Sequence, residues 1–387
     1  MLMNIKDINE VAIIGGGPGG LMLGLLLQQR DIPFTIYEKG TQDVNADRGG
    51  SLDIHDDSGQ LALQQAGIQE DFHQLARFDG EDTKVVGKDG TVYYTEVVDE
   101  DELGGRPEID RGELCDLILQ QIDDTHIRYH YQFESMETLD DGRCRVHFTN
   151  GETTEADLVV GVDGAFSKVR PYLSSQEIEY TGISMVELNV EDVEHEHSEL
   201  LAYNQRGKMM TLGGNRALLA QLNGDGRIKV YVSYRMEKET MDDYKAMSIA
   251  DLKAQVEQDF ADWAPELQRY ITEAGNEILL RRIYRLPIGF KWETQGNVTL
   301  LGDAAHLMSP FAGEGVNAAL YDAYLFDQAL AKADELNAVV RQYEYAMYAA
   351  SAQSAQESQD NLELMFSKGA AEKMGDFFKS VLDDTED

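Results

Sequence analysis

The sequence predicts an α/β protein that carries an inserted, mixed β-sheet region and ends in a long helix. Three observations support this fold class. A strand–helix–strand pattern fills residues 8–40, several short β-like runs lie within residues 180–236, and a helical pattern of polar and apolar residues extends over residues 338–366. Strands that alternate with helices indicate a parallel sheet, whereas strands joined by hairpin turns indicate an antiparallel or mixed sheet.

Length and composition limit the classes of protein that fit. The chain has 387 residues, which favours two domains over a single core. Its 33 basic and 71 acidic residues give a net charge of −38, and such a surface repels nucleic acid and anionic membranes. The segment MLMNIKDINE lacks the apolar core of a signal peptide, and no apolar run has the length of a membrane span. We therefore expect a cytoplasmic protein with no nucleic-acid or membrane partner.

The residue types that bind metals are sparse or badly spaced. Cys115 and Cys144 are the only cysteines, and their separation indicates neither a disulfide framework nor a zinc site. The acidic clusters lack the spacing of a calcium loop, and we interpret His195 and His197 as solvated loop residues. We expect no metal.

The stretch VAIIGGGPGGL, residues 11–21, has the features of a dinucleotide-binding turn. An apolar strand precedes Gly15, Gly17 and Gly20, which fit the spacing G-x-G-x-x-G, and an apolar helix follows. The first glycine permits a tight turn, the second lets a pyrophosphate approach the backbone, and the third lets helix and strand pack closely. A second strand, residues 34–37, ends at Glu38, a position from which a carboxylate accepts from ribose hydroxyls. FAD and NAD both fit this motif.

Two later motifs also place polar groups at the ends of apolar strands. Residues 158–162 lead into Asp163 in the pattern D-G-x-x-S-x-x-R, and residues 298–301 lead into Gly302 and Asp303. A carboxylate at such a strand end suits the hydroxyls of a ribityl chain. The loop 310–315 is followed by a helix that we expect to start near Val316, and its positive end suits the negative charge of a reduced flavin.

Together these motifs resemble those of the single-component, FAD-dependent aromatic-hydroxylase type of monooxygenase over nearly the whole chain. The segments VAIIGGGPGGL, GGSLDIHDDSGQLALQQAGI, PEIDRGEL and GDAAHLMSPFAGEGVN are most similar to the flavin-dependent tetracycline monooxygenases. The resemblance implies a Rossmann-like FAD-binding domain, a substrate domain over the flavin and a C-terminal helix that bridges them. We place the FAD-binding domain at residues 1–70, 105–175 and 286–335, the substrate-binding domain at 71–104 and 176–285, and the C-terminal helix and tail at 336–387.

The resemblance also implies which residues contact FAD. It adds Lys39, Asp53 and Arg111 to Glu38 and Asp303, and it makes Arg48 a candidate for contact with the flavin or the nicotinamide. The full set expected to bind the cofactor is Gly15, Gly17, Gly20, Glu38, Lys39, Arg48, Asp53, Arg111, Asp163, Gly302, Asp303, Pro310, Gly313, Gly315, Val316 and Asn317.

The reaction that the resemblance implies needs no catalytic side chain. NADPH or NADH reduces non-covalent FAD, O2 adds at C4a, and the peroxyflavin transfers one oxygen atom to a polycyclic or phenolic substrate, with tetracycline as one candidate. We expect His306 to support its loop and not to react. A flavin oxidase or reductase, and an inactive flavin-binding relative, are the alternatives. The expected partners are the substrate and O2, and the expected state is a monomer.

The resemblance finally implies a substrate wall. Its expected members are Glu187, Lys208, Pro310, Phe311, Gly313 and Met365. Glu187 and Lys208 replace a glutamine and an arginine of the tetracycline enzymes, and Cys115 replaces a further arginine. Because a carboxylate repels the ionised edge of tetracycline, we expect weak tetracycline turnover and better turnover by Glu187→Gln. The alternative is that Glu187 points to solvent.

Overall fold

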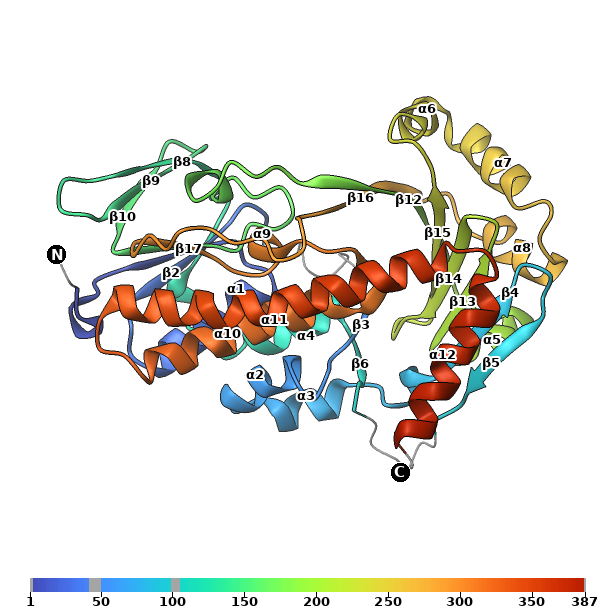
Figure 1. Ribbon diagram of the computed structural model, residues 1–387, viewed down its shortest axis with the longest axis horizontal. Coiled ribbons are helices and arrows are strands. Elements are labelled where there is room, and N and C mark those ends of the chain that lie inside the picture. Colours follow the sequence, from blue (N-terminus) through green and yellow to red (C-terminus); the bar gives the residue numbers. More distant parts are fainter. Residues whose placement is uncertain (1–2, 42–49, 99–104, 386–387) are drawn as a thin grey trace. The chain divides into compact units, whose positions relative to one another are not determined.

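The computed structural model describes residues 3–41, 50–98 and 105–385 (Figure 1). The chain divides into two compact units, each assembled from three separated segments. Unit 1 comprises Met1–Ala76, Arg111–Glu179 and Tyr284–Ser358, and unit 2 comprises Arg77–Asp110, Tyr180–Ile283 and Gln359–Asp387. The region after residue 335 therefore forms no body of its own, because it is shared between the two units.

A parallel sheet with the strand order β17-β11-β1-β2-β7 lies at the centre of unit 1. Val11 of β1 pairs with Leu158 of β11 on one side and with Phe34 of β2 on the other. Both β1 and β11 are buried throughout, as their uninterrupted apolar runs predict. The elements of unit 1 are η1 (Ile5–Asp7), β1 (Val11–Ile14), α1 (Pro18–Gln29), β2 (Phe34–Glu38), β3 (Ser51–Asp53), α2 (Gly59–Gln65), α3 (Gln69–Leu75), α4 (Arg111–Leu119), η4 (Asp124–His126), β7 (Ile127–Tyr129), β8 (Phe133–Thr138), β9 (Cys144–Phe148), β10 (Thr153–Ala156), β11 (Leu158–Gly161), η5 (Arg170–Tyr172), β17 (Val298–Leu300), α9 (Asp303–His306), η6 (Pro310–Ala312), α10 (Glu314–Leu330) and the larger part of α11 (Leu336–Met365).

A seven-stranded sheet with the order β16-β12-β15-β14-β13-β4-β5 dominates unit 2. It is mixed, as predicted, because β13 pairs with β4 in parallel while β13, β14 and β15 pair antiparallel. One face packs against the helices that follow β15, with Val230, Val256 and Leu267 among the buried residues of that core. The elements of unit 2 are η3 (Asp79–Glu81), β4 (Thr83–Gly87), β5 (Val92–Glu96), β6 (Glu108–Asp110), β12 (Glu179–Val190), α5 (Ser198–Asn204), β13 (Lys208–Gly213), β14 (Arg216–Leu222), β15 (Ile228–Arg235), α6 (Thr240–Ala246), α7 (Ile249–Asp259), α8 (Pro265–Thr272), β16 (Leu279–Arg285) and α12 (Ala370–Thr385).

Two expected boundaries are corrected. The helix expected near Val316 begins at Glu314, with Gly313 as its N-cap. The expected tail contains a further helix, α12, because Met374 is buried and Phe378 stacks on Tyr94 with ring centroids 5.2 Å apart. Among the described helices, none combines the length and the apolarity that crossing a bilayer requires.

Candidate functional site

The glycine turn after β1 has the backbone geometry that its spacing predicts. Gly15 has a φ of +121°, and a Cβ there would lie 2.3 Å from the carbonyl oxygen of Val162. A Cβ on Gly20 would lie 2.1 Å from the carbonyl oxygen of Gly15. These two glycines are therefore required by the packing of the protein's own backbone, since real Cβ atoms do not approach so closely.

Gly17 has a different role, because it faces open space. The nearest atom to a Cβ built on it is Nη2 of Arg111, 3.9 Å away. Gly17 is also the N-cap of α1, and no side chain caps this helix end. The first turn of an α-helix leaves backbone N–H groups without intrahelical partners, and these groups bind anions readily. The structure thus keeps an uncapped helix N-terminus in front of Gly17.

Glu38, at the end of β2, accepts hydrogen bonds from two backbone N–H groups. Gly16 donates to Oε2 with an N···O distance of 2.8 Å, and Gly40 donates to Oε1 at 2.7 Å. The carboxylate therefore holds the end of β2 against the glycine turn. Each carboxylate oxygen has a further lone pair, and the side chain is half-buried. Lys39, next in the chain, is exposed.

Arg170 joins the two motifs that follow β11 and β17. This buried guanidinium donates to the carbonyl oxygen of Ala165 at 2.7 Å and to that of Ala304 at 3.1 Å. Arg170 is the last residue of the pattern D-G-x-x-S-x-x-R, which by itself indicates no role for it. It also donates to the carbonyl oxygen of Asp303 at 3.4 Å, so its burial and its three carbonyl partners identify it as the residue that fixes one strand end relative to the other.

Asp163 shapes the turn after β11. Its Oδ2 accepts from the backbone N–H of Lys168 at 2.7 Å. Its Oδ1 is buried and has no hydrogen-bond partner among the residues that the structure describes. An orphaned buried carboxylate oxygen is costly, and a bound hydroxyl or amide would satisfy it.

Asp303 is the first residue of α9, directly after Gly302, whose φ is +63°. Protein packed around Asp303 reduces the hydration of its carboxylate and so raises its pKa, although the side chain keeps exposed surface. The cations that oppose this rise are His306, Arg111 and Arg170. Arg111 thus lies near both Gly17 and Asp303, so three positions expected to bind the cofactor are close together in unit 1.

A buried pair of side chains supports the loop that carries Asp303. Oδ2 of Asp322, on α10, accepts from the backbone N–H of Gly302 at 2.8 Å and lies 2.7 Å from Nε2 of His306. Burial lowers the pKa of His306, but the adjacent Asp322 and Asp303 outweigh this effect and leave the pKa raised. The geometry agrees with the expected supporting role of His306. The partner, Asp322, was not anticipated from the sequence.

The N-terminus of α10 is tied to β3 through Asn317. Its Oδ1 accepts from the backbone N–H of His55 at 2.9 Å, and its Nδ2 donates to the carbonyl oxygen of Asp53 at 2.8 Å. Gly313 has a φ of +72°, and a Cβ there would lie 3.0 Å from Oδ1 of Asp53. A Cβ on Gly315 would meet no described atom within 4 Å. The first turn of α10 therefore has open space beside it, and no side chain caps it.

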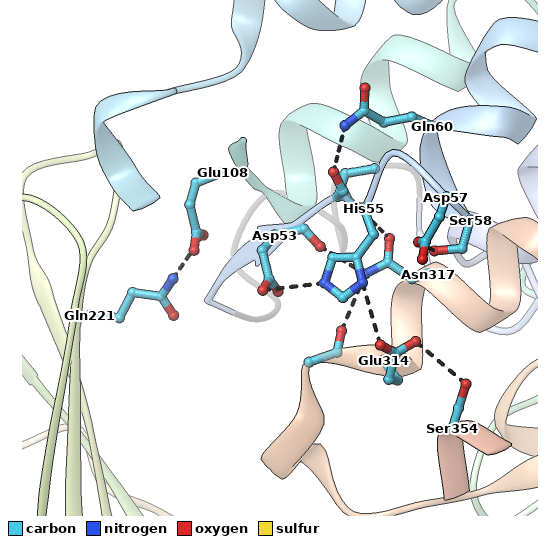
Figure 2. Close-up of polar contacts among 12 residues, drawn as sticks. Asp53, His55, Asp57, Ser58, Gln60, Glu108, Gln221, Glu314, Asn317 and Ser354 are labelled. Carbon is cyan, nitrogen blue, oxygen red and sulfur yellow. Dashed lines mark hydrogen bonds and ion pairs between the residues drawn. The ribbon is translucent and has the colours of Figure 1, made fainter. Parts of the chain in front are cut away.

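His55 connects the same two elements through its side chain, as Figure 2 shows. Nε2 lies 3.4 Å from Oδ2 of Asp53, and Nδ1 lies 3.4 Å from Oε1 of Glu314. The imidazole is buried between these two carboxylates. His55 was not predicted from the sequence, although it stands two residues after Asp53 in the segment GGSLDIH that carries the resemblance.

The other positions expected to bind the cofactor or the substrate lie before or at the start of α10, in unit 2, or outside the described residues. Pro310 is exposed, whereas Phe311 and Val316 are half-buried in the loop and first turn that lead into α10. Arg48 lies outside the described residues. The expected substrate wall is divided between the units: Pro310, Phe311 and Gly313 belong to unit 1, and Glu187, Lys208 and Met365 belong to unit 2.

Glu187, in unit 2, does not point to solvent, so that alternative is wrong. Only 7% of the residue is exposed, and its carboxylate forms ion pairs with Arg281 and with Lys229. The two cations offset its charge, which removes the reason for the expected repulsion of tetracycline. Lys208 is half-buried and Met365 is buried. On the same sheet, the Gln221 amide donates to Oε2 of Glu108 at 2.7 Å (Figure 2).

The parallel sheet, the glycine turn and the strand-end carboxylates of unit 1 define a dinucleotide-binding α/β protein. The chain belongs to the FAD-binding domain family, whose model matches residues 9–339. Monooxygenase penA of Penicillium thymicola is 26% identical over 431 aligned residues, which cover 96% of this chain and 98% of penA. Kynurenine 3-monooxygenase of Christiangramia forsetii is 25% identical and covers 81% of this chain and 70% of that enzyme. The protein is thus homologous to FAD-dependent monooxygenases.

Solved structures show the same fold. HpxO of Klebsiella pneumoniae in complex with FAD and uric acid superposes with a TM-score of 0.80 and 20% identity, over 97% of this chain and 94% of HpxO. Tetracycline destructase Tet(51) superposes with a TM-score of 0.69 and 17% identity, over 98% of this chain and 97% of that one. Tetracycline destructases are therefore one group among several that share the fold.

Proposed function

We propose that this protein uses NADPH or NADH and O2 to hydroxylate a polycyclic or phenolic small molecule, with non-covalent FAD as cofactor. The observation that carries the proposal is the convergence in unit 1 of an uncapped helix end at Gly17, the carboxylate of Glu38 and the pair Asp303 and Arg111. Homology to monooxygenases over nearly the full chain supports the reaction type.

The described residues of unit 1 fit FAD. Gly17 and Gly315 leave open the space that a Cβ would fill, in front of two helix N-termini that no side chain caps. The N–H groups at α1 would bind the pyrophosphate, and Glu38 would accept from the ribose of the adenosine. Asp303 would accept from the ribityl hydroxyls. The buried Oδ1 of Asp163 supplies one more acceptor.

The chain's own contribution to the reaction is binding and electrostatics. When bound, FAD supplies the transfer of electrons to O2 and the activated oxygen. The positive end of α10 would stabilise negative charge that develops beside it, because its first-turn N–H groups lack a capping side chain. Arg111 would hold positive charge near the phosphates and Asp303. No described side chain is needed as an acid or base for this role.

Oxygen balance is the test of the proposal. The purified protein, loaded with FAD, is supplied with NADPH or NADH and a panel of phenols and polycyclic compounds that includes tetracycline, under labelled O2. The expected result is substrate-stimulated consumption of NAD(P)H and O2 in equal amounts, with one labelled oxygen atom in the product by mass spectrometry.

The alternative activities give different balances. An oxidase forms hydrogen peroxide in an amount equal to its oxidised product, with no label in that product. An inactive flavin-binding relative consumes neither NAD(P)H nor O2 in a substrate-dependent way. Either result contradicts the proposed hydroxylation.

A further inference from the structure

A hollow of about 380 Å³ lies between α10 and α11 in unit 1. The two helices run side by side, and α11 returns along α10 in the opposite direction (Figure 1). Phe326 of α10 packs on Tyr343 of α11 with ring centroids 5.3 Å apart. Further along the pair, Ser354 of α11 donates to Oε2 of Glu314, at the start of α10, at 3.5 Å. The volume falls within the range of about 300–1,000 Å³ that is typical of small-molecule pockets.

The hollow is apolar at one end and positively charged at the other. Leu325 of α10 lines it together with Tyr345 and Ala346 of α11. Lys332 lines the other end, in the turn that leads from α10 to α11. Arg341 lies one helical turn nearer to this end than Tyr345, and long side chains on a helix lean toward the helix N-terminus. Its guanidinium is therefore directed toward the same end as Lys332.

Neither cation has a partner in the part of the chain that the structure describes. The side chains of Lys332 and Arg341 are exposed, and they form no ion pair and no hydrogen bond with a described residue. Acidic residues outnumber basic residues by 71 to 33 in this chain, so counter-ions are abundant, yet neither cation pairs with one. The donors of both side chains are thus open to an anion from outside the protein.

The carboxylates of the same helix pair do not neutralise these cations. Asp327 of α10 pairs with Arg30 of α1. Glu344 of α11 is buried and accepts from Nε1 of Trp292 at 2.8 Å. The two acidic residues of the turn, 334–335, form no ion pair with a described residue. They reduce the positive potential at this end of the hollow, but they leave the ammonium and guanidinium donors open.

The other end of the hollow offers apolar surface. Ala329 is buried, and Leu325 and Ala346 are half-buried along its walls. Tyr345 borders the hollow and is 80% exposed. An exposed aromatic ring beside apolar walls gives surface that the hydrophobic part of a ligand can cover. A ligand that fits both ends therefore has an anionic head and a narrow apolar body.

We propose that this hollow binds a free single-chain carboxylate, with its head on Arg341 and Lys332 and its alkyl chain along Leu325, Tyr345 and Ala346. The planar fork of a guanidinium matches a carboxylate. The volume suits one small molecule and not a folded partner, and the net charge of −38 repels an anionic bilayer. Leu325 lies about 16 Å along α10 from its first residue, so the site is separate from the proposed flavin site.

Binding is measured by isothermal titration calorimetry on the FAD-loaded protein, with all probes below their micelle concentrations. Octanoate, octanamide and octylammonium share one chain and differ in head charge, whereas butyrate shares the head and shortens the chain. Octanoate is expected to bind about fivefold or more tightly than octanamide and about tenfold or more tightly than butyrate. The proposal is overturned if octanamide, octylammonium or butyrate binds as tightly as octanoate.

Two variants remove the cations, and a third is their matched control. Arg341→Met and Lys332→Met are each expected to weaken octanoate by about threefold, and the double variant should bind octanoate and octanamide equally. Lys291, like Lys332, is an exposed lysine of unit 1 without an ion pair to a described residue. Lys291→Met should change neither affinity. A double variant that keeps the preference for octanoate, or an equal loss in Lys291→Met, would overturn the proposal.

The place of binding is tested separately from the charge. Ala346→Phe puts a larger side chain into the hollow and is expected to abolish octanoate binding, while the FAD content stays that of the native protein. An octanoate analogue with a diazirine on its chain should, after irradiation, attach to peptides that contain residues 325–332 or 341–346. Octanoate bound normally by Ala346→Phe, or attachment only to other peptides, would show that the acid binds elsewhere and would overturn the proposal.

Discussion

The polar sites of the two units are built in opposite ways. In unit 1, short sequence motifs fix the site: Gly15, Gly17 and Gly20 lie in the turn and the helix start that follow β1, and Glu38 accepts from the backbone N–H of Gly16 in that turn. In unit 2, a charged group joins Arg281 of β16, Glu187 of β12 and Lys229 of β15, and Glu187 meets Arg281 from far along the chain. Backbone geometry therefore defines the first site, and side-chain charge defines the second. Substitutions should accordingly disrupt the first by steric conflict and change the second by altering charge.

Gly20→Ala is expected to have the largest effect. Its methyl group would lie 2.1 Å from the carbonyl oxygen of Gly15, so the turn or the helix must shift. We expect a loss of stability of about 4 kcal/mol or more, together with loss of FAD. Thermal unfolding and flavin content after purification measure both.

Gly315→Ala is the matched control for this steric argument. No described atom lies within 4 Å of the added methyl group, and alanine in a helix gains up to about 1 kcal/mol over glycine. The variant should be at least as stable as the native protein but bind FAD more weakly, because the methyl group enters the open space. Normal FAD affinity would show that the flavin does not occupy this space.

Asp303→Ala is expected to have the second-largest effect. If Asp303 accepts from the ribityl chain, its loss removes a charge-assisted hydrogen bond worth roughly 1.5–3 kcal/mol, and FAD affinity should fall about ten- to a hundredfold. Asp303→Asn, which keeps one acceptor, should lose less. Fluorescence titration with FAD measures both, and circular dichroism checks folding. Unchanged affinity in folded Asp303→Ala removes this residue from the site.

Glu187→Gln is expected to have the third-largest effect. It tests the contrast between the units, because it should change stability and leave FAD binding in unit 1 nearly unchanged. Removing the carboxylate leaves Arg281 and Lys229 without their partner, which costs up to about 3–5 kcal/mol for a fully buried pair. Because half of Arg281 is exposed, we expect roughly 1–2 kcal/mol. FAD affinity should stay within about twofold. Thermal unfolding and FAD titration together check this, and an unaltered unfolding midpoint would mean that the ion pairs are not maintained in solution.

The pH dependence of stability gives the smallest expected effect. A histidine whose pKa is raised in the folded state stabilises the protein fully below its unfolded pKa, and this contribution is lost as the pH rises through the folded pKa. The pKa of His306 is raised above its ordinary value of 6.5. The unfolding midpoint should therefore decline as the pH increases above that value, and His306→Asn should lack this component. Identical pH profiles would assign the decline to other groups.

Whether the sequence predicted a feature depended on how far apart in the chain its contacting residues lie. The glycine turn and the end of β2 depend on neighbouring residues, and both were predicted. Features that depend on distant contacts were missed. Arg170 reaches carbonyl groups more than 130 positions away, and α12 forms because Phe378 meets Tyr94.

Burial of charge was the main source of error in unit 2. The sequence pattern assigned Glu187 either to a repulsive substrate wall or to solvent, because a single acidic residue does not reveal its counter-ions. In the structure, the counter-ions of Glu187 are Arg281 and Lys229. They lie beside Glu187 because of the strand order β16-β12-β15, in which strands distant in sequence are neighbours. No local signal encodes that order.

The division of both units into separated segments has a consequence for synthesis. In the parallel sheet, Val159 of β11 pairs with Val298 of β17, so β11 lacks its neighbour on that side until β17 has left the ribosome. In the mixed sheet, β4 pairs with β13, and Tyr94 of the neighbouring β5 stacks on Phe378 of α12, which is synthesised much later. Unit 1 therefore cannot be completed before β17 is synthesised, and unit 2 cannot be completed before α12 is synthesised. The nascent protein must pass this interval with unpaired strand edges, which is when chaperones protect such chains from aggregation.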